Sequence, residues 1–129
     1  METPFMGTLA VLGVRGRTGH MLALDGTWTL RSGAPVAHAT RVGDVELHRT
    51  VIGEIKRIDV VRQDGAVVLV AYGEGTPWLS DLLDAGSHSL SMDMENMHLD
   101  RFVRGETNVL AGRVAGALLV RADAFAWSA

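Results

Sequence analysis

The side chains best suited to chemistry in this chain are one serine and a set of histidines. Ser91 stands in the segment Ser87–Glu95, where polar and apolar residues alternate. Such alternation puts the polar residues on one face of a strand, where a serine is usually an ordinary solvated residue. Its hydroxyl becomes a nucleophile when a neighbouring imidazole takes its proton. Five histidines could supply that imidazole: His20, His38, His48, His88 and His98.

Other kinds of chemical site find little support in the sequence. The absence of cysteine excludes thiol catalysis, thiolate metal sites and a disulfide scaffold. The histidines lack the spacing of a zinc helix, and the acids at 93, 95 and 100 lack the pattern of a calcium loop. The glycines of segment 13–19 match neither phosphate-binding fingerprint, and no GxSxG elbow occurs. We therefore expect no metal and no cofactor.

Composition places the chain among ordinary globular proteins. With 129 residues, 47% hydrophobic and 21% charged, we expect one domain spanning residues 1–129. The formal net charge of -3 and the scattered basic residues argue against a nucleic-acid partner. The first residues carry an acid where a signal peptide needs basic residues, and no apolar stretch reaches membrane-spanning length. A soluble cytoplasmic protein with no membrane contact is expected.

The elements that must position these residues are predicted to be mainly strands. Fifteen glycines and short alternating segments favour a sheet with tight turns. Val51–Arg62 and Ala66–Tyr72 flank Asp64-Gly65, which predicts a hairpin, and the second run is apolar on both faces, as in a central strand. Further strands are expected at Met6–Val14, Met21–Leu24, Trp28–Leu30, Ala34–Ala37, Ser87–Glu95, His98–Val103 and Val109–Val120, the last crossing the core.

One helix is predicted between these strands. Thr76 is a candidate cap, Pro77 suits the first helical position, and Gly86 is expected to end the helix. Leu79, Leu82 and Leu83 share one face. In the strand that follows, alternation places His88, Leu90, Met92 and Met94 opposite Ser91.

Taken in order, these segments resemble the prohead proteases, or capsid maturation proteases, of tailed phages, which are related to the herpesvirus assemblin-type serine proteases. In that family a proline-led strand, a histidine and a long apolar strand precede a helix that ends at glycine. A strand carrying the nucleophilic serine and a closing apolar strand follow. The similar segments here are Ala34–Val36, His48, Val51–Ile55, Gly86, Leu90–Asp93, Arg113–Val120 and Ala122–Phe125.

The resemblance implies a mainly β, barrel-like fold and a serine endopeptidase that cleaves scaffold or capsid protein during procapsid assembly. Ser91 would then be the nucleophile and His48 the base, with His38 as the rival base. The third catalytic residue is open among Asp93, His98, His88 and Glu95. Strand alternation puts His88 opposite Ser91 and favours Asp93, or His98 if its strand pairs alongside.

The same resemblance also implies partners and a location. The expected partners are the phage major capsid protein, the scaffold or both, with the chain oligomeric or capsid-bound. It would act in the host cytoplasm, within the procapsid or on the virion head. Many relatives carry an acid in the closing strand where this chain has Gly116. An alternative is therefore a catalytically silent decoration or minor head protein that retains the protease fold. A generic β-barrel interaction module without a viral link is a third possibility.

Overall fold

Backbone pairing organises the computed structural model, which describes residues 2–16, 19–42, 45–101 and 107–122, into one mixed sheet of seven strands and one short helix. The mainly β prediction with a single helix is confirmed. The elements are β1 (Thr3–Val11), β2 (His20–Leu30), β3 (Pro35–Val42), β4 (Val45–Gln63), β5 (Ala66–Gly75), α1 (Pro77–Asp84), β6 (His88–Arg101) and β7 (Thr107–Arg121).

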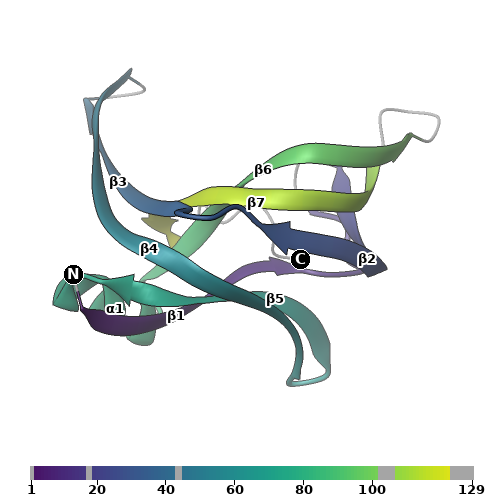
Figure 1. Ribbon diagram of the computed structural model, residues 1–129, viewed down its shortest axis with the longest axis horizontal. Helices are drawn as coiled ribbons and strands as arrows, with labels where there is room; N and C mark the ends of the chain where they lie inside the picture. The colour runs from purple at the N-terminus through teal and green to yellow at the C-terminus, as the bar shows by residue number, and fades with distance from the viewer. Residues whose placement is uncertain (1, 17–18, 43–44, 102–106, 123–129) are drawn as a thin grey trace.

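The sheet is curled but open (Figure 1). Its strands follow the order β1-β5-β4-β3-β7-β2, and β6 pairs with the other edge of β7. Strand β7 is antiparallel to β6 and parallel to both β2 and β3, with β2 along its first half and β3 at Ala117 and Leu118. The prediction that the last strand crosses the core is thus confirmed.

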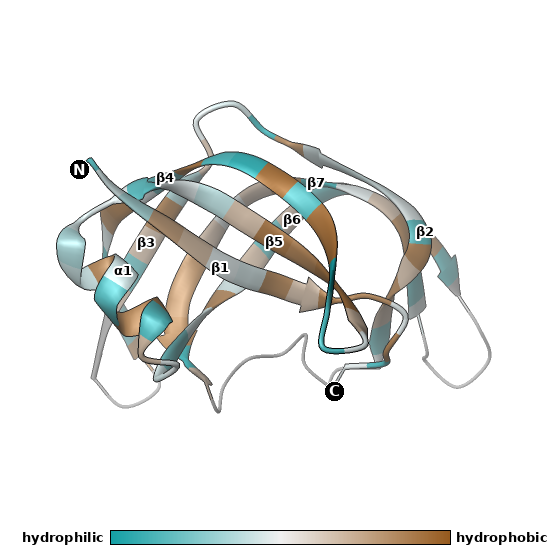
Figure 2. Cartoon of the chain, turned by 90° about the horizontal axis from the view of Figure 1, so that it is seen from below, coloured by the Kyte–Doolittle hydropathy of each residue, from teal (hydrophilic) through white to brown (hydrophobic). Residues whose placement is uncertain are grey.

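The prediction of a barrel-like fold is wrong in one respect, because the sheet does not close. Among the described residues, β1 pairs only with β5 and β6 only with β7, so no ladder joins the two ends of the sheet. Side chains fill this gap instead: a β-carbon on Gly7 would lie 2.7 Å from Leu90 Cδ1 and 3.4 Å from Leu83 Cδ1. Helix α1 contacts both β1 and β6 and covers this end of the sheet (Figure 2).

The predicted hairpin is confirmed, as is the central place of its second strand. Asp64 and Gly65 have φ angles of 49° and 80°, which is the left-handed pair that a two-residue type I′ turn requires. Strand β5 lies between β1 and β4. Its residues Val68 to Ala71 are all buried.

Helix α1 begins at Pro77 and is followed by Gly86 with a φ of 76°, as predicted. Its capping was predicted wrongly. The Thr76 hydroxyl is buried, makes no capping hydrogen bond, and has no hydrogen-bond partner among the described residues. The Thr76 backbone N–H donates to the Ile52 carbonyl at 3.0 Å, so pairing with β4 fixes the entry to the helix.

Two strand boundaries also differ from expectation. Met21–Leu24 and Trp28–Leu30 belong to one strand, β2, whose register slips between Leu22 and Thr27. The separate strand predicted at His98–Val103 is instead the end of β6, which continues through a left-handed Asn96 with a φ of 52°. Residues 102 and 103 lie outside the described residues. A local bend therefore looks like a strand break in the sequence.

One hydrophobic core lies on the inner face of the curled sheet. The alternation predicted for Ser87–Glu95 is confirmed: Leu90 and Met92 are buried, whereas Ser91 and Asp93 face outward. Gly112 makes room for the Met94 side chain, because a β-carbon there would lie 2.2 Å from the Met94 sulfur. The outer face of β6 therefore carries the residues of the predicted site.

Leu79 should contribute strongly to stability, because it is fully buried and packs against Gly53 and Gly75, where β4 and β5 approach closely. Replacing it by alanine leaves a cavity under α1, so Leu79→Ala is expected to lower the free energy of unfolding by about 3 kcal/mol in urea denaturation. The exposed Asp81→Ala in the same helix serves as the control and should change it by less than about 0.5 kcal/mol. Equal effects of the two substitutions would contradict this packing.

Candidate functional site

Ser91 lies on β6, half-buried on the outer face of the sheet. In β7 it pairs with Leu118, which in turn pairs with Ala37 of β3, and Ala37 pairs with Val51 of β4. Residues in register on neighbouring strands project from the same face. The row of side chains running across the sheet through Ser91 is therefore apolar.

The next row on this face also lacks a histidine. It runs from Asp93 to Gly116, on to Pro35, and from there to Glu54. Gly116 lies so close to β3 that a β-carbon would stand 2.8 Å from the Pro35 carbonyl oxygen. Asp93 is the member of the row nearest Ser91, two residues along the same strand. The register thus brings Ser91 and the predicted third residue Asp93 to one face, without a histidine in either row.

His48 lies on β4, exposed, and pairs with Thr40 of β3. Strands β7 and β3 separate β6 from β4, so three strand spacings, or roughly 14 Å, lie between Ser91 and Val51, the β4 residue of its row. His48 stands three positions before Val51, roughly 10 Å further along β4, and this odd offset turns it to the other face by alternation. In the described part of the chain no side-chain hydrogen bond links Ser91 to His48. The predicted dyad is not assembled by this register.

The rival base His38 follows Ala37 and therefore also turns away from the outer face. Its ring meets Trp78 of α1 edge-on, with centroids 5.8 Å apart and planes at 87°. Trp78 itself is exposed, so this contact lies at the surface where β3 passes the helix. The sequence contained no signal for the pair.

The remaining candidates for the third position have other surroundings. His88 has its Nδ1 2.9 Å from the Ser87 hydroxyl. His98 pairs with Ala111 beyond the bend at Asn96, seven residues and roughly 20 Å along β6 from Ser91. Neither histidine is a neighbour of Ser91 in the sheet.

Glu95 contacts two arginine side chains on the outer face. Its carboxylate accepts a hydrogen bond from Arg113 Nε at 2.9 Å and lies 3.7 Å from Arg31. Because both guanidiniums already engage this carboxylate, it is poorly placed to orient an imidazole. The strand pairing of β6 with β7 creates this cluster, since Glu95 and Arg113 are in register.

A second charged group lies where β4 passes the same face. Arg49 donates to Glu46, and the hydrogen bond and charge of Glu46 raise the pKa of the Arg49 guanidinium above its ordinary value. The charge of Asp93 adds a smaller effect in the same direction.

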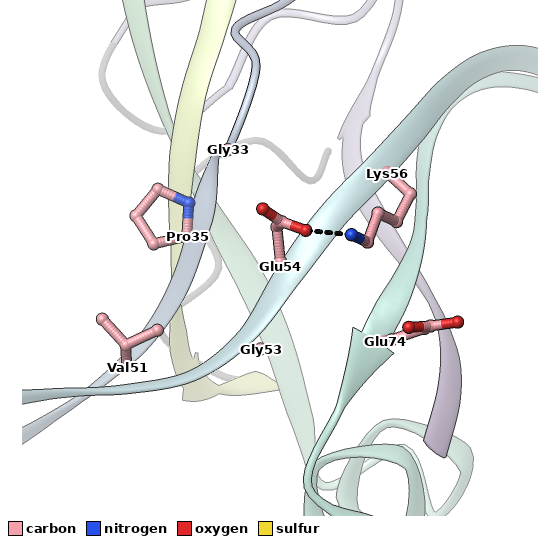
Figure 3. A pocket seen from close by; sticks show the side chains of 7 residues that line it. All are labelled: Gly33, Pro35, Val51, Gly53, Glu54, Lys56 and Glu74. Carbon is pink, nitrogen blue, oxygen red and sulfur yellow. Dashed lines mark ion pairs between the residues drawn. The ribbon is translucent and has the colours of Figure 1, made fainter. Parts of the chain in front are cut away.

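A shallow groove of about 250 Å³ lies over β3, β4 and β5 (Figure 3). Glu54 and Glu74 are in register on β4 and β5, and Lys56 pairs with Glu54. The hydrogen bond and charge of Glu54, with a smaller effect of Glu74, raise the pKa of Lys56. The groove is lined by Gly33, Pro35, Val51, Gly53, Glu54, Lys56 and Glu74.

Sequence reasoning missed this groove for a specific reason. The turn at Asp64-Gly65 alone would put Glu54 opposite Gly75, but the register slips by one residue between Ile55 and Arg57.

No group of three potential metal ligands occurs among the described residues. In the part of the chain that the structure describes, no helix is long and apolar enough to cross a membrane.

Comparison with known proteins gives no match: no family model, curated protein or solved structure corresponds to the chain. The likeness to prohead proteases therefore depends on the order of the sequence segments, and the catalytic roles of Ser91, His48 and Asp93 stay predictions.

The register predicts how Ser91 reacts with a fluorophosphonate probe. Because no imidazole lies beside Ser91, the unaltered chain should be labelled no faster than the Ser91→Ala variant, as measured by intact-mass spectrometry. Leu118→His places an imidazole opposite Ser91, at a Cβ separation of about 5 Å. Labelling should then rise about tenfold or more and vanish in the double variant with Ser91→Ala. Rapid labelling of Ser91 in the unaltered chain would show that a native histidine reaches it.

Proposed function

We propose that the chain is a catalytically silent head protein of a tailed phage, which keeps a prohead-protease-like fold and binds the capsid as a decoration or minor head protein. The observation that carries the silent assignment is the apolar row through Ser91, in which Leu118 lies opposite Ser91 and Ala37 is the next residue across the sheet. The phage context comes from the resemblance of the sequence segments. The partners are the major capsid protein or scaffold, in the host cytoplasm, within the procapsid or on the virion head.

The surroundings of Gly116 support the same proposal. Many relatives carry an acid at this place in the closing strand, and here the approach of Pro35 leaves no room even for a β-carbon. An acidic side chain would have to push β3 away from β7, which would disturb the pairing of Val36 with Ala117. Loss of the acid is therefore compatible with close packing of the strands, and recovery of the acid would disrupt that packing.

A second candidate function is the head-maturation serine endopeptidase itself. Ser91 is half-buried and shares its face with Asp93, and β3 carries His38 about two strand spacings, or roughly 10 Å, from β6. Among the described residues β3 pairs with β7 only at Val36 and Ala37, and a slip of one residue in this short ladder would turn His38 to the face of Ser91. His38 would then be the base in place of His48, and Asp93 the third residue.

Co-expression with the phage capsid and scaffold proteins separates the two candidates. The silent protein should leave capsid processing unchanged between the native chain and Ser91→Ala, and should itself stay intact and sediment with assembled shells. Gel electrophoresis of sedimented shells measures both. Cleavage of capsid or scaffold that requires Ser91 would overturn the proposal. In that case His38→Ala and His48→Ala would identify the base, because only one of them should abolish cleavage.

A further inference from the structure

A cavity of about 550 Å³, open to solvent on one side, lies where the end of β1, the turn of the β4–β5 hairpin and β2 meet. Its volume is within the range of small-molecule sites, which are typically concave, mostly apolar and provided with few polar groups. The described lining residues are Val11, Leu12, Val14, Leu24, Arg62, Gly65, Ala66 and Val67.

The walls of this cavity are apolar and fixed in place. Leu12 is only 2% exposed and belongs to the core, and Val67 packs against that core. Leu24 is 60% exposed but lies over Gly13, where a β-carbon would come within 2.7 Å of Leu24 Cγ. The Gly13 N–H donates to the Leu22 carbonyl at 2.7 Å, which ties the end of β1 to β2. A large exposed leucine is thus held as one wall of a preformed apolar space.

Arg62 alone carries a charge among the described lining residues. The other cations of the same part of β4 have partners: Lys56 pairs with Glu54, and Arg57 pairs with Asp59 at 3.2 Å and stacks on Tyr72. In the described part of the chain no ion pair or hydrogen bond engages the Arg62 side chain. A guanidinium with free donors therefore borders an apolar cavity.

We propose that this cavity binds an aliphatic monocarboxylate of medium chain length. Its chain would lie against Leu12, Leu24 and Val67, where removal of apolar surface from water drives binding. Its carboxylate would pair with Arg62, whose planar fork matches two carboxylate oxygens. A single cation favours one negative charge over a multiply charged phosphate. The inference is independent of the proposed head function, since it uses no residue of the outer face around Ser91.

Calorimetric titration of the full chain with decanoate, below its micelle concentration, tests this proposal. We expect saturable binding at one site, with 1-decanol binding about fivefold more weakly because it lacks the charge that Arg62 would engage. Arg62→Gln should remove this difference between the two ligands while leaving the melting temperature unchanged. Leu24→Ala should weaken both ligands by a similar factor. The control Arg57→Gln, on the same strand but outside the cavity, should leave the affinity for decanoate as in the unaltered chain.

Several outcomes would overturn the proposal. If decanoate binding does not saturate, the cavity does not bind an aliphatic carboxylate. If decanoate binds more tightly than 1-decanol by the same factor in the unaltered chain and in Arg62→Gln, Arg62 does not bind the carboxylate. A peptide ending in leucine provides a further arm of the titration. If that peptide saturates the cavity and decanoate does not, the site takes a polypeptide terminus and the acyl assignment is wrong.

Discussion

The backbone pairing of β7 is the constraint on which the rest of the structure depends. This strand has β6 along one edge, and β2 and then β3 along the other. Because paired residues share a face, its register decides what each residue of β6 meets across the sheet. A slip of one residue would exchange the outer row of Ser91 with the inner row of Met92 and Ala117. Burial of that inner row in the core therefore stabilises the observed register.

Close contacts at two glycines let the open sheet enclose its core. Gly7 lets the Leu90 side chain fill the space between β1 and β6, and Gly116 lets the backbone of β3 come close to β7. The first makes a closing ladder unnecessary, because side chains and α1 cover the gap that hydrogen bonds would otherwise close. The second fits β3 tightly against β7, because the Pro35 carbonyl lies where a β-carbon of residue 116 would stand.

The charged and apolar surfaces of the protein lie in different parts of the sheet. On the outer face, Glu95 gathers two arginines and Glu46 binds Arg49, so these charges largely satisfy one another. At the hairpin end, Arg62 borders apolar walls, and no ion pair in the described part of the chain engages its side chain. Internally paired charges contribute little to binding a partner, whereas an unpaired cation beside an apolar cavity provides both affinity and orientation. The hairpin end is therefore the part of the molecule best suited to hold a small amphiphile.

The sequence by itself determined the local features of this protein. The turn at Asp64-Gly65, the start and end of α1, and the alternation around Ser91 follow from backbone angles and from the two-residue period of a strand. Only the tertiary structure decided which strands pair and with what slip. The bulge near Lys56 that sets Glu54 opposite Glu74, and the apolar neighbours of Ser91, result from contacts between residues distant in the chain. Local periodicity carries no information about such pairings, because register is chosen by burial of the whole inner face at once.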